Sequence, residues 1–126
     1  MMTAGMAELT TTNGTHYIFK PDAVLAISDR DRTCILGLTP GVIQIAEPVT
    51  EFLRRIDRIE RFAHLDQGGG TSLWVSALAV SIVRLPLAGE FAPAIRAVVI
   101  AGSVTQGVLE NPDEVRARIN AAGGNL

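Results

Sequence analysis

The sequence predicts an α+β domain built from two pseudo-symmetric β-rich repeats, each a small antiparallel sheet or half-barrel followed by one helix. The first observation is an internal duplication, because residues 7–29 can be laid over residues 63–85 without a gap. The second is that short β-type runs, separated by turn residues, precede one helical pattern in each copy. We therefore expect a single domain over residues 1–126, with repeats at residues 7–61 and 63–121.

The duplication depends on identical residues at matched positions. In the first register Ala7 falls on Ala63, Leu9 on Leu65, Gly14 on Gly70, Thr15 on Thr71, Ala23 on Ala79 and Val24 on Val80. After an insertion at residues 86–93 of the second copy, Glu47 falls on Glu110, Glu51 on Glu114, Arg55 on Arg118 and Ile56 on Ile119. Such matches predict architecture and say little about chemistry.

In the first copy, Asn13-Gly14 is a strong hairpin signal, and Pro21-Asp22 imposes a bend because proline cannot donate to a strand ladder. A first helix should begin at Glu47-Pro48 and run to about Arg61, with apolar residues at helical spacing. Strands are expected at residues 7–12, 16–19, 23–28, 33–38 and 42–46, with a loose tail at 1–5 and a charged hairpin tip at 29–32.

In the second copy, residues 68–70 form a glycine turn and residues 86–93 an inserted apolar loop. Asn111 caps a second helix that has proline at its first position and Glu114 at its third, and Gly123-Gly124 ends it. Strands are expected at residues 63–66, 72–76, 78–85, 94–101 and 104–109.

The second copy is unusually apolar. Between Gln67 and Leu109 the charged residues are Arg84, Glu90 and Arg96, and the strands there barely alternate apolar with polar residues. Such strands are covered on both faces, and one helix hides only part of a sheet. We therefore expect a homo-oligomer, or a complex with another protein, formed through interface residues Trp74, Val80, Leu87, Phe91 and Val98.

Two of these residues have an alternative role. Trp74 aligns with Ile18, a strand position, so it also fits a core. Phe91 lies in the inserted loop, where an aromatic residue anchors a partner or folds back over its own sheet.

Composition excludes several classes of protein. Hydrophobic residues make up 48% and charged residues 19% of the 126, so the chain is not disordered. The net charge of −2 gives no general attraction to nucleic acid or anionic lipid. With one cysteine, Cys34, no signal-peptide pattern and no apolar run long enough to span a bilayer, a cytoplasmic protein without membrane insertion is expected.

No catalytic residue, metal site or cofactor is predicted. His64 and Asp66 share a strand face, but His16 does not align with either, and a zinc site needs three or four protein ligands. Cys34 lies in a strand without a nearby histidine, and no Gly-Lys-Ser/Thr follows the glycines at 68–70.

The first helix carries the one local concentration of positive charge. Arg54, Arg58 and Arg61 share a predicted helix face, with Arg55 beside them, and such a face can contact phosphates. Acidic residues are interleaved with these arginines and the domain is acidic overall, so a solvated helix face is the favoured interpretation. A DNA-binding regulator that uses this helix stays the alternative.

The first copy resembles the FlbD-type small flagellar proteins of bacteria. The resemblance covers residues 7–56, and faintly 63–120, so the chain looks like a tandem duplication of that unit. The matching features are an Asn-Gly hairpin at 9–14 and a bent strand with Pro-Asp-Ala at 17–24. They continue with a further hairpin at 34–38 and 42–47 and an acidic helix start at 49–52. No catalytic residue belongs to that pattern, so the resemblance carries none across to this chain.

A second resemblance is to LytTR-type DNA-binding domains, through residues 21–29, 42–56 and 60–65. In that family a basic strand after the helix contacts DNA, whereas residues 64–70 here contain no arginine. The sequence thus predicts a small assembly or interaction protein that self-associates through its apolar second half.

Overall fold

The computed structural model describes residues 5–30 and 32–126, and within these ranges it has ten strands, two α-helices and three short 3-10 helices. It is a mixed α+β fold with three antiparallel sheets. Most of the predicted N-terminal tail, residues 1–4, and Asp31 of the predicted charged tip lie outside the described residues.

The elements follow one another as hairpin, 3-10 turn, three strands and helix, and then in the same order again. The first series is β1 (Ala7–Thr10), β2 (His16–Phe19), η1 (Pro21–Ala23), β3 (Ala26–Ser28), β4 (Thr33–Leu36), β5 (Ile43–Ile45) and α1 (Val49–Arg55). After η2 (Ile59–Arg61), the second is β6 (Phe62–Gly68), β7 (Thr71–Ser76), η3 (Ala77–Ala79), β8 (Val80–Arg84), β9 (Ala97–Ala101), β10 (Val104–Val108) and α2 (Pro112–Ala121).

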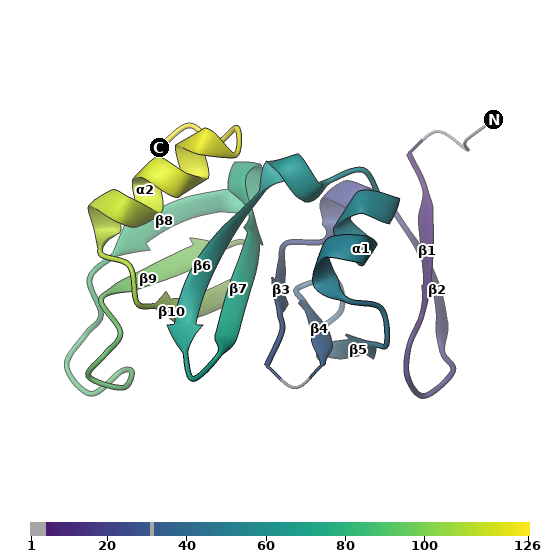
Figure 1. Ribbon diagram of the computed structural model, residues 1–126, viewed down its shortest axis with the longest axis horizontal. Helices are drawn as coiled ribbons and strands as arrows, with labels where there is room; N and C mark the ends of the chain where they lie inside the picture. The colour runs from purple at the N-terminus through teal and green to yellow at the C-terminus, as the bar shows by residue number, and fades with distance from the viewer. Residues whose placement is uncertain (1–4, 31) are drawn as a thin grey trace.

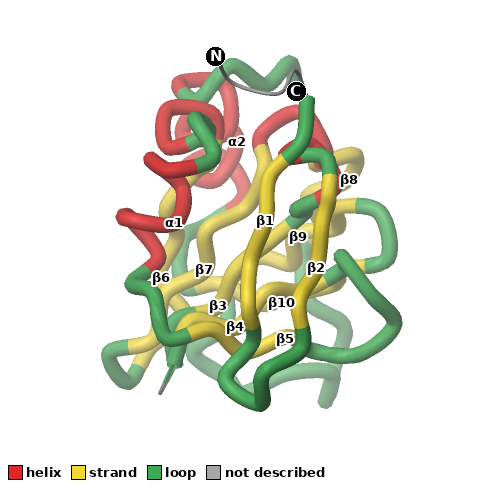
Figure 2. Tube along the Cα trace, turned by 90° about the vertical axis from the view of Figure 1, so that its right-hand side faces the viewer, coloured by secondary structure: helices red, strands yellow, loops and turns green. Residues whose placement is uncertain are grey.

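The three sheets have the strand orders β1-β2, β5-β4-β3-β7-β6 and β10-β9-β8. The five-stranded sheet joins the two series, because β3 pairs with β7 at Ala26↔Val75, Ile27↔Trp74 and Ser28↔Leu73. Along the longest axis, β1 and β2 stand at one end and α2 with β8, β9 and β10 at the other (Figure 1). Figure 2 looks onto the end that β1 and β2 form.

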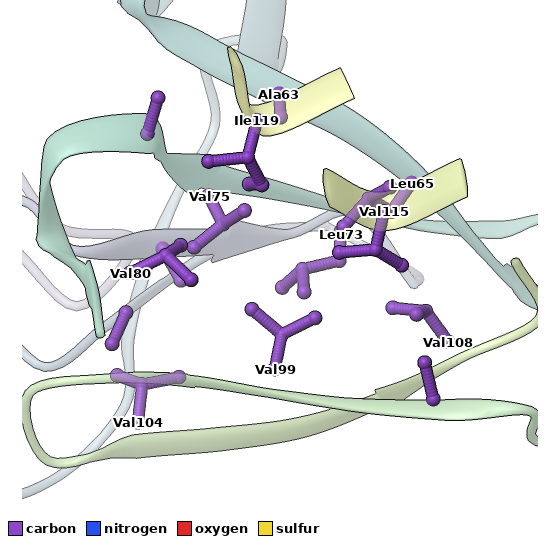
Figure 3. Close-up of a cluster of buried hydrophobic side chains, with 14 residues drawn as sticks. Ala63, Leu65, Leu73, Val75, Val80, Val99, Val104, Val108, Val115 and Ile119 are labelled. Atoms are coloured by element: carbon purple, nitrogen blue, oxygen red, sulfur yellow. The ribbon is translucent and has the colours of Figure 1, made fainter. Parts of the chain in front are cut away.

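The buried apolar residues form two clusters, one mainly in each series, with Phe62 of β6 in the first and Ala26 of β3 in the second. The first-half core lies under α1 and contains Phe52, Leu53 and Ile35, all fully buried. The second-half core, shown in Figure 3, is filled from β6 to β10 and from α2, where Val115 and Ile119 point inward. The apolar residues at helical spacing in the sequence thus anchor both helices.

The strands of the second half meet along β6 and β10. The Leu109 amide donates to the Asp66 carbonyl at 2.7 Å, and the Gln67 side-chain amide donates to the Gly107 carbonyl at 3.0 Å. The second-half core is therefore closed on this side, and β8 is left at the other side of its sheet.

The first helix is shorter than predicted. It ends at Arg55 rather than near Arg61, because Asp57 adopts a left-handed backbone (φ 59°). The Arg58 amide then bonds to the Leu53 carbonyl at 2.8 Å and the Asp57 amide to the Arg54 carbonyl at 3.0 Å, which is a Schellman ending. This turn leads the chain into β6, so tertiary structure overrides a helical pattern that continues in the sequence.

Several predicted strands begin later than expected, among them the one predicted at 94–101, which starts at Ala97, and two of these strands follow a 3-10 turn. The strand predicted at 78–85 starts at Val80, after η3, and the one predicted at 23–28 starts at Ala26, after η1. In both places the chain makes one 3-10 turn before it enters the next strand. No helix among the described residues is long and apolar enough to cross a membrane.

Candidate interaction surface

Large apolar side chains are exposed mainly at two places. One group surrounds β8: Leu78 in η3, Ile82 in β8, and Leu85 and Leu87 just after it. A second group, Met6 and Ile18, lies at the β1–β2 end. Val42 is exposed in the turn before β5, where it lines a hollow with Tyr17 of β2.

Strand β8 is a sheet edge. It pairs with β9, and no described strand pairs with its other side. Its side chains Ser81 and Ile82 are exposed. An exposed apolar edge presents unpaired backbone N–H and C=O groups, which makes it a template for pairing with another chain.

Strand β2 is another edge strand among the described strands. It pairs with β1 alone among the described strands, and Ile18 at its centre is 63% exposed. Ile18 also lines a groove of about 610 Å³ that lies between β1 and the end of α1, with Met6, Pro21 and the paired side chain of Arg58 in its wall. The two free edges belong to opposite ends of the molecule (Figure 1).

The five residues predicted for a protein interface do not share one surface. Leu87 is exposed, whereas Val80 and Val98 are 7% and 0% exposed inside the chain itself. A partner would thus meet their exposed neighbours, above all Ile82, rather than these two side chains. The sequence signal that identifies β8 as a free edge is weak, since strand order is set by tertiary pairing.

The inserted loop folds over its own sheet. A Cβ placed on Gly107 would lie 2.8 Å from Ile95 Cγ2 and 3.1 Å from Phe91 Cδ1. Gly107 is paired with Val98 in the β9–β10 ladder, so the loop covers this face of the hairpin. Phe91 is accordingly half-buried, which fits the second of the two roles that the sequence leaves open for it.

An ion pair ties this loop to β8. The Arg84 guanidinium donates to both Glu90 oxygens, at 2.8 and 2.6 Å, and Glu90 Oε1 also accepts from the Leu87 amide at 2.9 Å. Hydrogen bonds from Arg84 and then from the Leu87 amide lower the pKa of Glu90 to about 2. The loop after β8 is therefore anchored, and its exposed Leu85 and Leu87 are displayed rather than free to fold inward.

Trp74 lies at the junction of the two halves. It is paired with Ile27 across β3 and β7, and it packs against the first-half core. Its ring stacks on His64, with centroids 4.1 Å apart and an interplanar angle of 8°. The Trp74 Nε1 atom is buried without a hydrogen-bond partner among the described residues. Trp74 is half-buried and contacts both halves, so it contributes to the junction within the chain.

The arginines of the predicted basic face are dispersed. Arg55 bonds to Glu47 at 2.9 and 3.0 Å, and Arg58 bonds to Asp22 at 2.8 Å. Since α1 ends at Arg55, Arg58 and Arg61 do not continue its helical face, although Arg54 and Arg61 are exposed. The shared face that sequence spacing predicted for Arg54, Arg58 and Arg61 does not form.

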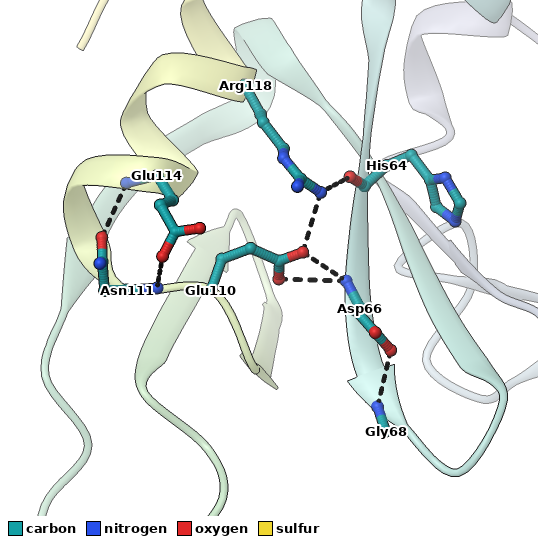
Figure 4. A network of polar contacts seen from close by, with 7 residues as sticks. All are labelled: His64, Asp66, Gly68, Glu110, Asn111, Glu114 and Arg118. Carbon is teal, nitrogen blue, oxygen red and sulfur yellow. Dashed lines mark hydrogen bonds and ion pairs between the residues drawn. The ribbon is translucent and has the colours of Figure 1, made fainter.

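A polar network fixes α2 to β6 (Figure 4). Buried Glu110 accepts from the Asp66 amide at 3.0 and 3.1 Å and from Arg118 at 2.8 Å, and Arg118 also reaches the His64 carbonyl at 3.0 Å. Asn111 and Glu114 form the predicted capping box. The sequence alignment marked Glu110 and Arg118 as matched residues, but only the structure shows that they bond to each other.

The remaining reactive side chains are engaged locally or partly covered. His16 bonds to Glu8 at 2.9 Å and contacts Thr10 at 3.2 Å, and Cys34 is half-buried in β4. Within residues 5–30 and 32–126, no group of three or more His, Cys, Asp or Glu side chains could hold a metal ion.

The chain has no match that would indicate its class by similarity. No protein-family model, curated protein or solved structure matches it. The class of protein that its surface supports therefore has to be argued from the geometry alone.

Proposed function

We propose that this chain is a non-catalytic assembly protein, a tandem duplication of one β-rich unit that self-associates through its apolar second half. The observation that carries the proposal is the unpaired edge of β8 with exposed apolar side chains on and around it. Large exposed apolar groups at a free edge mark protein contact sites.

The pairing registers support the duplication. In β1–β2 the partners are Ala7↔Phe19, Glu8↔Ile18, Leu9↔Tyr17 and Thr10↔His16. In β6–β7 they are Ala63↔Val75, His64↔Trp74, Leu65↔Leu73 and Asp66↔Ser72, which are the residues that the sequence alignment places over the first set. The same alignment places η1 over η3.

Polar contacts support it as well. Arg55 bonds to Glu47 and to the Glu8 carbonyl, while Arg118 bonds to Glu110 and to the His64 carbonyl. Each of the three residues in the first half, Glu8, Glu47 and Arg55, aligns with its counterpart in the second, which is His64, Glu110 and Arg118 respectively. A duplicated unit that keeps the same clamp from helix to first strand explains both sets of bonds.

The kind of partner follows from the chemistry of the surface. Around β8 the large exposed side chains are aliphatic, and Arg84 at the end of the strand is neutralised by its ion pair with Glu90. A surface of this type fits a protein strand or apolar face better than a phosphate backbone. Nucleic-acid binding through Arg54, Arg55, Arg58 and Arg61 has less support, because two of them are already paired with carboxylates.

The test is the mass in solution, measured by light scattering over a dilution series. The chain should exceed its 13.4 kDa monomer mass, and Ile82→Lys should shift the equilibrium at least tenfold toward monomer. Val42→Lys is the matched control, because Val42 is 61% exposed but lies away from β8. A wild-type chain that stays monomeric at all concentrations would refute the proposal.

A further inference from the structure

We infer that copies of this chain associate head to tail, with β8 of one copy pairing antiparallel with β2 of the next. The inference rests on the proposed self-association and specifies its geometry. It is argued from the one junction between halves that the chain already contains, the pairing of β3 with β7.

Within the chain, β3 of the first half adds to the outer edge of β7. The counterparts of these two strands are β8 and β2, since the alignment places residues 26–28 on 82–84 and residues 72–75 on 16–19. Both counterparts have a free edge on the corresponding side, because β8 pairs with β9 as β3 pairs with β4, and β2 pairs with β1 as β7 pairs with β6.

The ladders beside the two junction strands share their register. The β3–β4 partners are Ala26↔Leu36, Ile27↔Ile35 and Ser28↔Cys34, and the β8–β9 partners are Ile82↔Ile100, Val83↔Val99 and Arg84↔Val98. Strand β8 therefore presents its outer edge in the way that β3 presents its own to β7. By the register of the internal junction, Ile82, Val83 and Arg84 would pair with Phe19, Ile18 and Tyr17 of the next copy.

Three of the exposed apolar residues, Met6, Ile18 and Ile82, occupy positions that this junction would cover. Phe62 and Trp74 are buried or half-buried at the internal junction, where they pack with the first-half core. Their counterparts, Met6 and Ile18, are 40% and 63% exposed. On the other edge, fully buried Ala26 has Ile82, 48% exposed, as its counterpart. At the internal junction these positions are buried or half-buried, and at the β2 and β8 edges they are exposed. This is the pattern expected if the two edges form the same contact with another copy.

A symmetric dimer through two β8 edges is the competing arrangement. It would leave the exposed Ile18 and the groove beside it without a partner. The head-to-tail contact uses both edges. Its strand register is the one already present between β3 and β7. Such a contact is heterologous, so it generates rings or filaments instead of stopping at a dimer.

Complementation between two blocked chains tests this geometry. Ile18→Lys blocks the β2 edge and Ile82→Lys the β8 edge, so each variant alone should be monomeric by light scattering. Mixed in equal amounts, they retain one free β8 and one free β2, and should form a one-to-one complex of twice the 13.4 kDa chain mass. Thr105→Lys, at an exposed position in β10, should assemble as the wild type does, and thermal melting checks that each variant is folded.

Cysteine cross-linking provides a measurement that does not depend on blocking. In a Cys34→Ser background, Ile18→Cys and Val83→Cys chains should form a disulfide-linked pair when they are mixed and oxidised. Each variant oxidised by itself should give little disulfide-linked dimer. A chain that carries both cysteines should give a ladder of multimers on a denaturing gel.

The outcomes separate the two proposals. An oligomer that survives Ile18→Lys, with Val83→Cys chains cross-linking to one another, overturns the head-to-tail arrangement and leaves self-association through β8 standing. A wild-type chain that is monomeric at every concentration overturns both. Dissociation by each lysine, restoration on mixing and the mixed disulfide together support the inference.

Discussion

Arg118 in α2 donates to the buried carboxylate of Glu110 at 2.8 Å. Glu110 lies in the connection between β10 and α2. Glu110 is 7% exposed by its side chain, and its oxygens also accept from the Asp66 amide. Glu47, which the sequence alignment matches to Glu110, is 30% exposed by its side chain and is paired with Arg55. The carboxylate of the Arg118–Glu110 pair is therefore buried, whereas that of the Arg55–Glu47 pair is partly solvated.

This difference in burial predicts unequal losses of stability. Arg118→Met should lower the free energy of unfolding by about 1–3 kcal/mol, because it leaves a buried carboxylate with one partner fewer. Arg55→Met should cost about 0.2–1 kcal/mol, since water screens Glu47. Urea unfolding of both variants measures the difference. Equal losses would contradict the assignment of Glu110 as the buried member.

Acid should release the inserted loop. The pKa of Glu90 is about 2, below its ordinary value of 4.5, so the ionised carboxylate stabilises the fold above pH 4.5. This contribution is lost as the pH falls from 4.5 toward 2. Melting temperatures of the wild type and Glu90→Gln should therefore differ at pH 6 and converge near pH 2.

The matched control for this titration is Glu51→Gln, on the exposed side of α1. It should change the melting temperature little at pH 6. If Glu90→Gln and the wild type differ by the same amount at every pH, the Arg84–Glu90 pair does not stabilise the loop.

Gly107 should be required for the loop to pack on the β9–β10 hairpin. Gly107→Ala places a methyl group 2.8 Å from Ile95 Cγ2 and should cost about 1–3 kcal/mol of unfolding free energy. Adding Ile95→Ala should recover part of that loss, because it removes the clashing atom. Gly41→Ala is the control, with open space around its Cβ, and an equal effect there would rule out the clash as the cause.

Ile119 should anchor α2 through the second-half core shown in Figure 3. It is fully buried, so Ile119→Ala should lower the free energy of unfolding by about 2–5 kcal/mol through lost burial and the cavity left behind. Val42→Ala, at an exposed site, should stay within about 0.5 kcal/mol. A loss below 1 kcal/mol for Ile119→Ala, measured by urea unfolding, would mean that α2 is not held by this core.

Much of the secondary structure could be predicted from local chemistry. Asn13-Gly14 lies in the β1–β2 turn, and Asn111 with Glu114 forms a capping box, because both are set by residues within a few positions of one another. The end of α1 could not be predicted, since Asp57 occupies the left-handed position where a glycine would have signalled the stop.

The candidate site was harder to predict than the fold. An apolar second half was evident from the sequence, but Val80 and Val98 looked as suitable for an interface as Ile82 did. Val80 and Ile82 even lie in the same edge strand, β8. Only tertiary packing distinguishes the three side chains, because Val80 and Val98 are 7% and 0% exposed inside their own chain whereas Ile82 is 48% exposed. Apolar character alone does not say whether a side chain meets its own chain or another.

The amino-acid sequence by itself determined the α+β class, the hairpin turns, the second helix and its cap, because these depend on backbone preferences and apolar spacing over short distances. Tertiary structure decided which edges stay unpaired, where α1 stops, and which carboxylate is buried with its arginine. The physical reason is that hydrogen-bond ladders between distant strands, such as β3 with β7, fix exposure, and no local pattern encodes their partners.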